Sequence, residues 1–152
     1  MKRVLITGMS GTGKSSVLAA LAARGYKTID TDYDGWTERV GDEWLWCEDR
    51  IADLLSTEDA DVLFVSGTVR NQVKYYSRFD HIVLLSAPLD VMTERLRSRT
   101  NNPYGKSNDE LTEVLGFTQT VEPALRRAAD LEVDTSVPLD DVIAKILGVV
   151  LA

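Results

Sequence analysis

The chain has 152 residues, of which 44% are hydrophobic and 27% are charged, and its formal net charge is −7. This length and apolar content suit one core, so we predict a single domain over residues 1–152, and the acidic balance argues against a nucleic-acid partner, which would require a basic face. A single cysteine, Cys47, excludes an internal disulfide, and one histidine leaves too few ligands for structural zinc.

Signals for export or membrane insertion are not expected in this sequence. No apolar stretch approaches membrane-spanning length, and a predicted strand begins directly after the first three residues. We therefore expect no membrane partner and predict a cytoplasmic protein that is a monomer or a homodimer.

A glycine-rich loop follows the first predicted strand. The segment Gly8 to Ser15 reads Gly-Met-Ser-Gly-Thr-Gly-Lys-Ser and is followed by a helix-forming segment. A G-x-x-x-x-G-K-[ST] sequence in this context binds the phosphates of a nucleoside triphosphate, because loop N–H groups and the helix N terminus form an anion cradle, in which Gly11 and Gly13 leave room. Lys14 would reach the β- and γ-phosphates, and the Ser15 hydroxyl would ligate Mg²⁺. The residues predicted to bind the nucleotide are Gly8, Ser10, Gly11, Thr12, Gly13, Lys14, Ser15 and Ser16.

Five apolar runs of strand character alternate with segments of helical period. This alternation predicts an α/β fold of three αβα layers, with a parallel sheet covered on both faces. In such a sheet, ligands bind beyond the carboxyl ends of the strands. The predicted strands are Val4–Thr7, Thr28–Asp30, Val62–Ser66, Ile82–Ser86 and Leu131–Asp134.

Two further segments are predicted to border the site. A mostly helical stretch over about residues 35–56, broken near Gly41, would bind an acceptor molecule, and a short lid would cover about residues 97–110. The first segment contains all three tryptophans, Trp36, Trp44 and Trp46. They would either stack on a planar acceptor or fill the core, and core packing is the commoner role of large aromatic side chains.

Three carboxylates follow the second predicted strand at alternate positions. If the segment is extended, Asp30, Asp32 and Asp34 point to one side, toward the glycine-rich loop. One of these carboxylates could then hold a water on Mg²⁺, and another could accept the proton of an acceptor hydroxyl. Asp32 and Asp34 are candidates for substrate binding. The alternative is a capping and turn cluster before a helix, and Asp34 fits that role best.

Two residues after the third predicted strand are candidates for substrate binding. Gly67 would let a substrate approach the backbone, and Arg70 could bind a carboxylate or phosphate with both guanidinium nitrogens. Alternatively, Arg70 pairs with a surface acid and contributes little.

Basic residues precede the predicted lid. Arg95 and Arg99 are four residues apart and share a helix face, which suits closure of positive charge over a moving phosphate. We therefore predict catalytic roles for Lys14, Asp32, Arg95 and Arg99. The alternative for the arginines is a solvated, basic helix end that complements the helix dipole.

These motifs resemble the small P-loop kinases, the group that contains shikimate kinase, gluconate kinase and the nucleoside monophosphate kinases. The glycine-rich loop matches the group, and Ile29-Asp30-Thr31-Asp32 resembles the Asp-x-Asp of shikimate kinases. The resemblance implies a five-stranded parallel sheet in the order 2-3-1-4-5 and transfer of the ATP γ-phosphoryl group to a small molecule. By the same resemblance, Lys14 and Ser15 would bind ATP and Mg²⁺, Asp30 would lie near the metal, Asp32 would hold the acceptor, and Arg95 or Arg99 would be the lid arginine.

The chain departs from shikimate kinases at the acceptor side. Ser66-Gly67-Thr68 stands where they have a glycine triplet, and Trp46 aligns with their acceptor-binding arginine. The segment Ser66 to Arg70 instead partly resembles the Asp-Gly-x-Pro-Arg of nucleoside monophosphate kinases. The acceptor, a nucleotide or another metabolite, therefore stays open, with a sugar, a nucleoside and an aminoglycoside among the candidates. The alternative function is a nucleotide-binding ATPase or switch that acts through a protein partner.

Overall fold

A five-stranded parallel sheet forms the centre of the molecule. The computed structural model describes residues 1–98 and 106–152. The strands lie side by side in the order β2-β5-β1-β6-β7, which is the predicted order 2-3-1-4-5 when the sheet's own strands are counted. Their bounds are β1 Lys2–Thr7, β2 Lys27–Asp30, β5 Val62–Ser66, β6 His81–Ser86 and β7 Leu131–Asp134.

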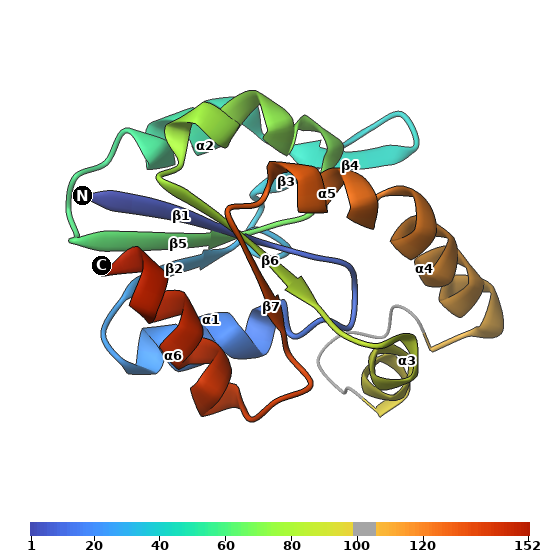
Figure 1. Ribbon diagram of the computed structural model, residues 1–152. Helices are drawn as coiled ribbons and strands as arrows, with labels where there is room; N and C mark the ends of the chain where they lie inside the picture. The colour runs from blue at the N-terminus through green and yellow to red at the C-terminus, as the bar shows by residue number, and fades with distance from the viewer. Residues whose placement is uncertain (99–105) are drawn as a thin grey trace.

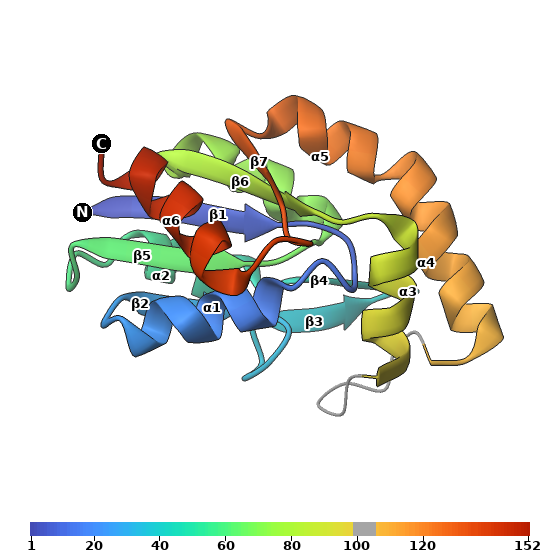
Figure 2. The same cartoon turned by 60° about the horizontal axis from the view of Figure 1, so that its bottom comes forward.

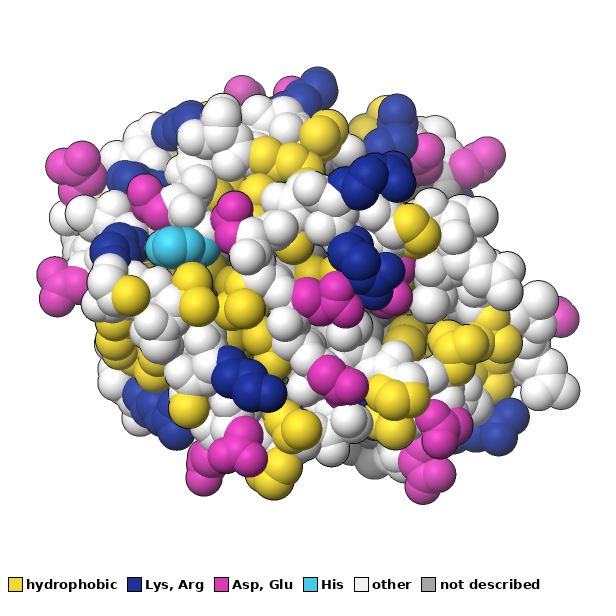
Figure 3. All heavy atoms as spheres, viewed as in Figure 1, with side chains coloured by type: hydrophobic (Ala, Val, Ile, Leu, Met, Phe, Trp, Pro, Cys, Tyr) yellow, Lys and Arg dark blue, Asp and Glu magenta, His cyan; other side chains and the backbone are white. Residues whose placement is uncertain are grey.

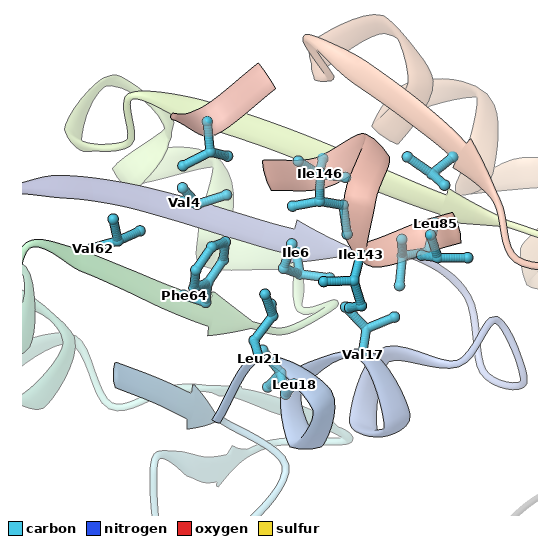
Figure 4. Packing of buried hydrophobic residues seen from close by; sticks show 14 residues of the cluster. Val4, Ile6, Val17, Leu18, Leu21, Val62, Phe64, Leu85, Ile143 and Ile146 are labelled. Atoms are coloured by element: carbon cyan, nitrogen blue, oxygen red, sulfur yellow. The ribbon is translucent and has the colours of Figure 1, made fainter. Parts of the chain in front are cut away.

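Helices cover both faces of this sheet (Figures 1 and 2). On one face lie α1 (Lys14–Ala23) and α6 (Leu139–Val150), and on the other lie α2 (Glu48–Leu55) and the 3₁₀ helix η1 (Arg70–Arg78). Alternate residues of β1 point to opposite faces, so Val4 and Ile6 pack with α1 and α6 while Leu5 packs with α2. Figure 4 shows the first of these clusters, in which side chains from the sheet and the two helices interdigitate. The three-layer prediction is confirmed.

Three further helices lie toward the carboxyl end of the sheet. They are α3 (Leu89–Ser98), α4 (Asn108–Thr120) and α5 (Glu122–Ala128). The side chains of Met92 and Leu96 in α3 pack in a third cluster with Leu111 of α4 and Met9 of the glycine-rich loop. This cluster holds α3 against the loop, which places α3 beside the predicted site. Figure 2 shows the same arrangement, with α3 beyond the end of β6.

The prediction of a mostly helical stretch over residues 35–56 is wrong for its first half. Residues 37–46 form an antiparallel hairpin of β3 (Thr37–Val40) and β4 (Glu43–Trp46). Val40 pairs with Glu43, so the turn has two residues, and its first residue, Gly41, has φ +64°. Glycine adopts positive φ without strain, which favours a tight hairpin over a broken helix. Helix α2 then begins at Glu48, so only the second half of the stretch is helical.

The surface is mixed in character. Figure 3 shows acidic and basic side chains interspersed on one face, with no gathering of a single sign. Among the described residues, no helix is long and apolar enough to cross a membrane.

Candidate functional site

The glycine-rich loop connects β1 to α1 and curls around the N terminus of the helix. Gly11 and Gly13 have φ values of +87° and +96°, which side-chain-bearing residues rarely adopt. A Cβ at Gly11 would lie 3.0 Å from the Met92 carbonyl oxygen, and one at Gly8 would lie 2.5 Å from that of Leu85. Glycine is therefore required at positions 11 and 13 by the backbone conformation, and at positions 8 and 11 by close packing against β6 and α3. The predicted reason, room for an anion, is not the only one.

A pocket of about 310 Å³ opens in front of this loop. Six of the eight residues predicted to bind the nucleotide contribute to its wall, and Gly8 and Thr12 do not. Thr12 is fully buried and its hydroxyl donates to the Met9 carbonyl at 2.7 Å, while the Gly8 N–H is 3.3 Å from the Thr68 hydroxyl. These two residues shape the loop from behind. The pocket is lined by Ser10, Gly11, Gly13, Lys14, Ser15, Ser16, Asp32, Tyr33, Arg95 and Ser98.

Positive charge and backbone donors meet in this pocket. Lys14 Nζ donates to the Gly8 carbonyl at 2.7 Å and to the Met9 carbonyl at 3.2 Å, so the ammonium lies over the loop. The first hydrogen bond into α1 runs from Val17 N to Gly13 O, and the preceding N–H groups therefore emerge from the helix N terminus. A helix N terminus with an adjacent lysine is an anion-binding arrangement.

Two side chains whose oxygen atoms could bind a hard cation, Ser15 and Asp30, are hydrogen-bonded to each other. The Ser15 hydroxyl donates to the Asp30 carboxylate at 2.9 Å, and Asp30 is half-buried at the end of β2. The described residues contain no cluster of three or more acidic, histidine or cysteine side chains that could hold a metal alone. Mg²⁺ typically binds one or two protein oxygens together with phosphate oxygens and waters, so this donor set fits Mg²⁺ on a bound nucleotide.

The three carboxylates do not point to one side, as the extended-segment prediction required. The chain turns directly after Asp30, with Asp32 N donating to the Asp30 carboxylate at 3.1 Å, and Asp34 has φ +61°. The turn brings Asp32 and Tyr33 into the pocket wall. Asp34 is exposed outside the pocket lining, and its backbone carbonyl accepts a hydrogen bond of 2.9 Å from Arg50. Tight-turn geometry at Asp34 replaces the extended backbone on which the prediction rested.

Arg95 enters the pocket from α3 and is held by two segments of the chain. Its guanidinium donates to the Thr135 hydroxyl at 2.8 Å, to the Thr135 carbonyl at 2.6 Å and to the Gly11 carbonyl at 3.3 Å. The Thr135 hydroxyl in turn donates to the Thr12 carbonyl at 2.6 Å. Next to this network, hydrogen bonds from Ser136 lower the pKa of Asp134, and the nearby Arg95 charge acts in the same direction. Arg99 and residues 99–105 of the predicted lid lie outside the described residues.

Gly67 is enclosed by the protein itself. Trp46, at the end of the hairpin, has no exposed surface, and a Cβ at Gly67 would lie 2.9 Å and 3.0 Å from two atoms of its indole. The indole Nε1 donates to the Thr31 hydroxyl at 2.9 Å, which donates to the Ser66 carbonyl at 2.6 Å. Gly67 is buried, and the Thr31 hydroxyl, 2.7 Å from such a Cβ, and the tryptophan leave no room for a side chain there. The structure does not expose this backbone, and its role in substrate binding stays a prediction.

Arg70 lies at the surface, at the start of η1. Its Nε is 2.8 Å from the Glu43 carboxylate, and the arginine side chain is 75% exposed. This is the surface ion pair that the sequence left open as the alternative. The structure does not bring Arg70 to the pocket lining, and its role toward a substrate stays a prediction.

The supporting roles of four residues were not anticipated from the sequence, in which Asn71 and Gln72 are only weaker candidates for binding a substrate beside Arg70. Thr31 and Thr135 directly follow β2 and β7, and this position at the carboxyl ends of strands is the feature of the sequence that could have identified them. Asn71 is buried, and its side-chain amide bonds both the N–H and the carbonyl of Trp46 at 3.0 Å and 3.1 Å. Gln72 is buried against the Thr7 hydroxyl at 3.2 Å. These contacts join the hairpin and η1 to the sheet and could not be read from residue spacing.

Comparison with known proteins gives related folds and sequences. The model of the AAA domain family matches residues 4–116. A shikimate kinase of Geobacter sulfurreducens is 30% identical over 168 residues, covering 95% of this chain and 88% of that protein. A nucleotide-binding protein of Erythrobacter litoralis is 30% identical over 148 residues, covering 88% of this chain and 46% of that protein. The chain spans about half the length of the first curated relatives it matches.

Solved structures with a similar fold also include a shikimate kinase. The structure of shikimate kinase from Acinetobacter baumannii in complex with shikimate superposes with a TM-score of 0.70, over 99% of this chain and 93% of that one, at 19% identity. At this identity the likeness concerns the fold. The predicted resemblance to small P-loop kinases is thus confirmed for the architecture and the nucleotide loop.

Proposed function

Because this chain belongs to the AAA domain family, we propose, from the contents of its pocket, that it is an ATP-binding, magnesium-dependent kinase that phosphorylates a small molecule. One observation carries the proposal: a single pocket joins the glycine-rich loop and Lys14 to Asp32, with Arg95 in the same wall. Phosphoryl transfer needs anion binding, charge neutralisation and an acceptor-orienting base within a few ångströms of one another.

The described side chains divide this work between two sides of the pocket. On the nucleotide side, the α1 N terminus and Lys14 would bind the β- and γ-phosphates, and Arg95 would lie against the transferred group. Ser15 and Asp30 would hold Mg²⁺, which neutralises phosphate charge when bound. On the acceptor side, Asp32 would orient the attacking hydroxyl and take its proton.

The proposed reaction has a specific donor, acceptor class and location. The donor is ATP, and the acceptor is a small metabolite or nucleotide in the cytoplasm. The alternative, an ATPase or switch acting through a protein partner, would hydrolyse nucleotide without forming a phosphorylated small molecule. A β5 strand that ends in Ser66, without an acid to position water, favours the kinase.

A phosphoryl-transfer screen tests the proposal. Purified protein, Mg²⁺ and ATP or GTP would be incubated with nucleosides, nucleoside monophosphates, sugars, sugar acids, shikimate and aminoglycosides, and products would be identified by mass spectrometry. Asp32→Asn is the matched control, which should retain ATP binding in calorimetry and lose transfer. Nucleotide hydrolysis without any phosphorylated acceptor would favour the switch, and loss of ATP affinity in the variant would move Asp32 to the metal.

A further inference from the structure

Two pocket-lining residues that belong neither to the nucleotide loop and α1 nor to α3 identify the side of the pocket on which an acceptor would sit. These residues are Asp32 and Tyr33, and both follow the end of β2. The neighbouring approach, along the end of β5, is closed because the buried Trp46 indole lies against Gly67 and is hydrogen-bonded to Thr31. An acceptor seated against this part of the pocket would therefore contact a carboxylate and a phenol.

Four of the described cations in the hairpin, α2 and η1 contact groups of the protein. Arg50 donates to the Asp34 carbonyl at 2.9 Å, and its guanidinium lies 4.1 Å from the centre of the Trp36 ring. Arg39 donates to the Gly41 carbonyl at 3.2 Å. The two cations of η1 that face the hairpin and α2 are also paired: Arg70 with Glu43 at 2.8 Å and Lys74 with Glu48 at 2.9 Å.

The charge of the surrounding segment has the same sign as Asp32. Residues 30–50 contain eight carboxylates and two arginines, and both arginines are among the engaged cations. Like charges brought together at a binding site disfavour a ligand, and a field of one sign attracts ligands of the other. An acceptor with a carboxylate or phosphate would meet this field, and among the described residues only Lys14 and Arg95 in the pocket could offset it, both of which face the nucleotide loop.

We propose that the acceptor is a polyol-type alcohol that carries no carboxylate or phosphate and is either neutral or aminated. This inference rests on the proposed kinase function and specifies its acceptor. In the reaction, the acceptor hydroxyl oxygen bonds to the γ-phosphorus while the bond from that phosphorus to the bridging oxygen breaks. ADP leaves with the electron pair of the broken bond, and the hydroxyl proton passes to Asp32. An ammonium group on the acceptor would lie within the field of the acidic segment.

A matched series of acceptors that differ in one group tests this inference. The probes are gluconate, glucitol and 1-amino-1-deoxyglucitol, with adenosine and AMP as a second pair, assayed with ATP and Mg²⁺ for phosphorylated product. We expect kcat/KM for the neutral and aminated members to exceed that of the anionic members by at least about tenfold, the equivalent of one like-charge contact. The KM of the aminated hexitol should rise with salt, while that of glucitol should not change, because only the former is drawn by charge.

Binding of a non-hydrolysable ATP analogue, measured first by calorimetry, distinguishes failure of the kinase function from failure of the acceptor assignment. A protein that does not bind the analogue contradicts the proposed kinase function itself. With the analogue bound, transfer to gluconate or AMP alone, or transfer to no neutral or aminated probe, would overturn the acceptor assignment and leave the nucleotide site intact.

Discussion

Lys14 is a side chain whose contribution to chemistry and to folding can be separated. Its ammonium donates to two loop carbonyls, at 2.7 Å and 3.2 Å, and its side chain belongs to none of the buried hydrophobic clusters. Lys14→Ala should therefore lower kcat by about 10²–10³, as expected for loss of one preorganised charge at a transition state. The melting temperature measured by circular dichroism should change little. Full turnover in the variant would rule out the proposed role of the lysine.

Thr135 connects Arg95 to the glycine-rich loop, and its hydroxyl can be removed without changing the shape of the side chain. Thr135→Val leaves the Arg95 guanidinium and the Thr12 carbonyl without this buried partner, which should cost about 1–3 kcal/mol of unfolding free energy. Because Arg95 would lose its hydrogen bond to the hydroxyl and keep those to the Thr135 and Gly11 carbonyls, ATP affinity should also fall, by up to about tenfold in calorimetry. Thr135→Ser keeps the hydroxyl and is the matched control. Equal behaviour of the two variants would mean that the hydroxyl does not position Arg95.

Trp46 packs the end of the β3–β4 hairpin against the sheet. The indole is fully buried, packs with the Tyr75 ring at 5.9 Å between centroids and hydrogen-bonds Thr31. Trp46→Ala should cost about 3–5 kcal/mol in urea unfolding, the usual range for a buried aromatic removed from a core. Gly67→Ala should also destabilise the protein, because the new Cβ would lie 2.7 Å from the Thr31 hydroxyl and 2.9 Å from the indole.

A double variant that carries both Trp46→Ala and Gly67→Ala tests their contact more directly than either single variant. In the double variant, the methyl group introduced by Gly67→Ala would no longer meet the indole and would keep only its contact with the Thr31 hydroxyl, so the two free-energy losses should be less than additive. Strict additivity would show that Trp46 and Gly67 do not share this contact, and with it the closed approach along β5 would lose its support.

The two halves of the 35–56 segment also show where sequence reasoning succeeds and fails. The parallel sheet and its order followed from strong local signals, namely buried apolar runs and a glycine-rich loop between a strand and a helix. The hairpin did not, because a two-residue turn at Gly41 and the tertiary burial of Trp46 override helix-compatible spacing. At the site, Ser15 and Asp30 are brought together as predicted from strand ends, whereas Asp34 and Arg70 face elsewhere because turn conformation and pairing partners depend on the assembled fold.

Ion pairs at both edges of the sheet make the stability of the whole molecule dependent on pH. At the β2 edge, Lys27 hydrogen-bonds Asp59 and lowers the pKa of its carboxyl. At the β7 edge, Arg126 donates to Glu132 at 2.6 Å and 3.2 Å, and these hydrogen bonds lower the pKa of Glu132. A carboxyl whose pKa is lowered by folding adds stability above its unfolded pKa, which is about 4, and loses it as the pH falls through the folded pKa.

Thermal unfolding from pH 7 to pH 3 should therefore show a melting temperature that is nearly constant down to about pH 5 and declines below about pH 4. Glu132→Gln isolates one edge, since the amide keeps the shape of the side chain and cannot ionise. This variant should melt below the unmodified protein at pH 7, by a small margin because the pair is partly exposed, and the difference should vanish as Glu132 itself becomes protonated in acid. A difference that stays the same across this range would assign the effect to packing of the side chain and not to the charge that Arg126 stabilises.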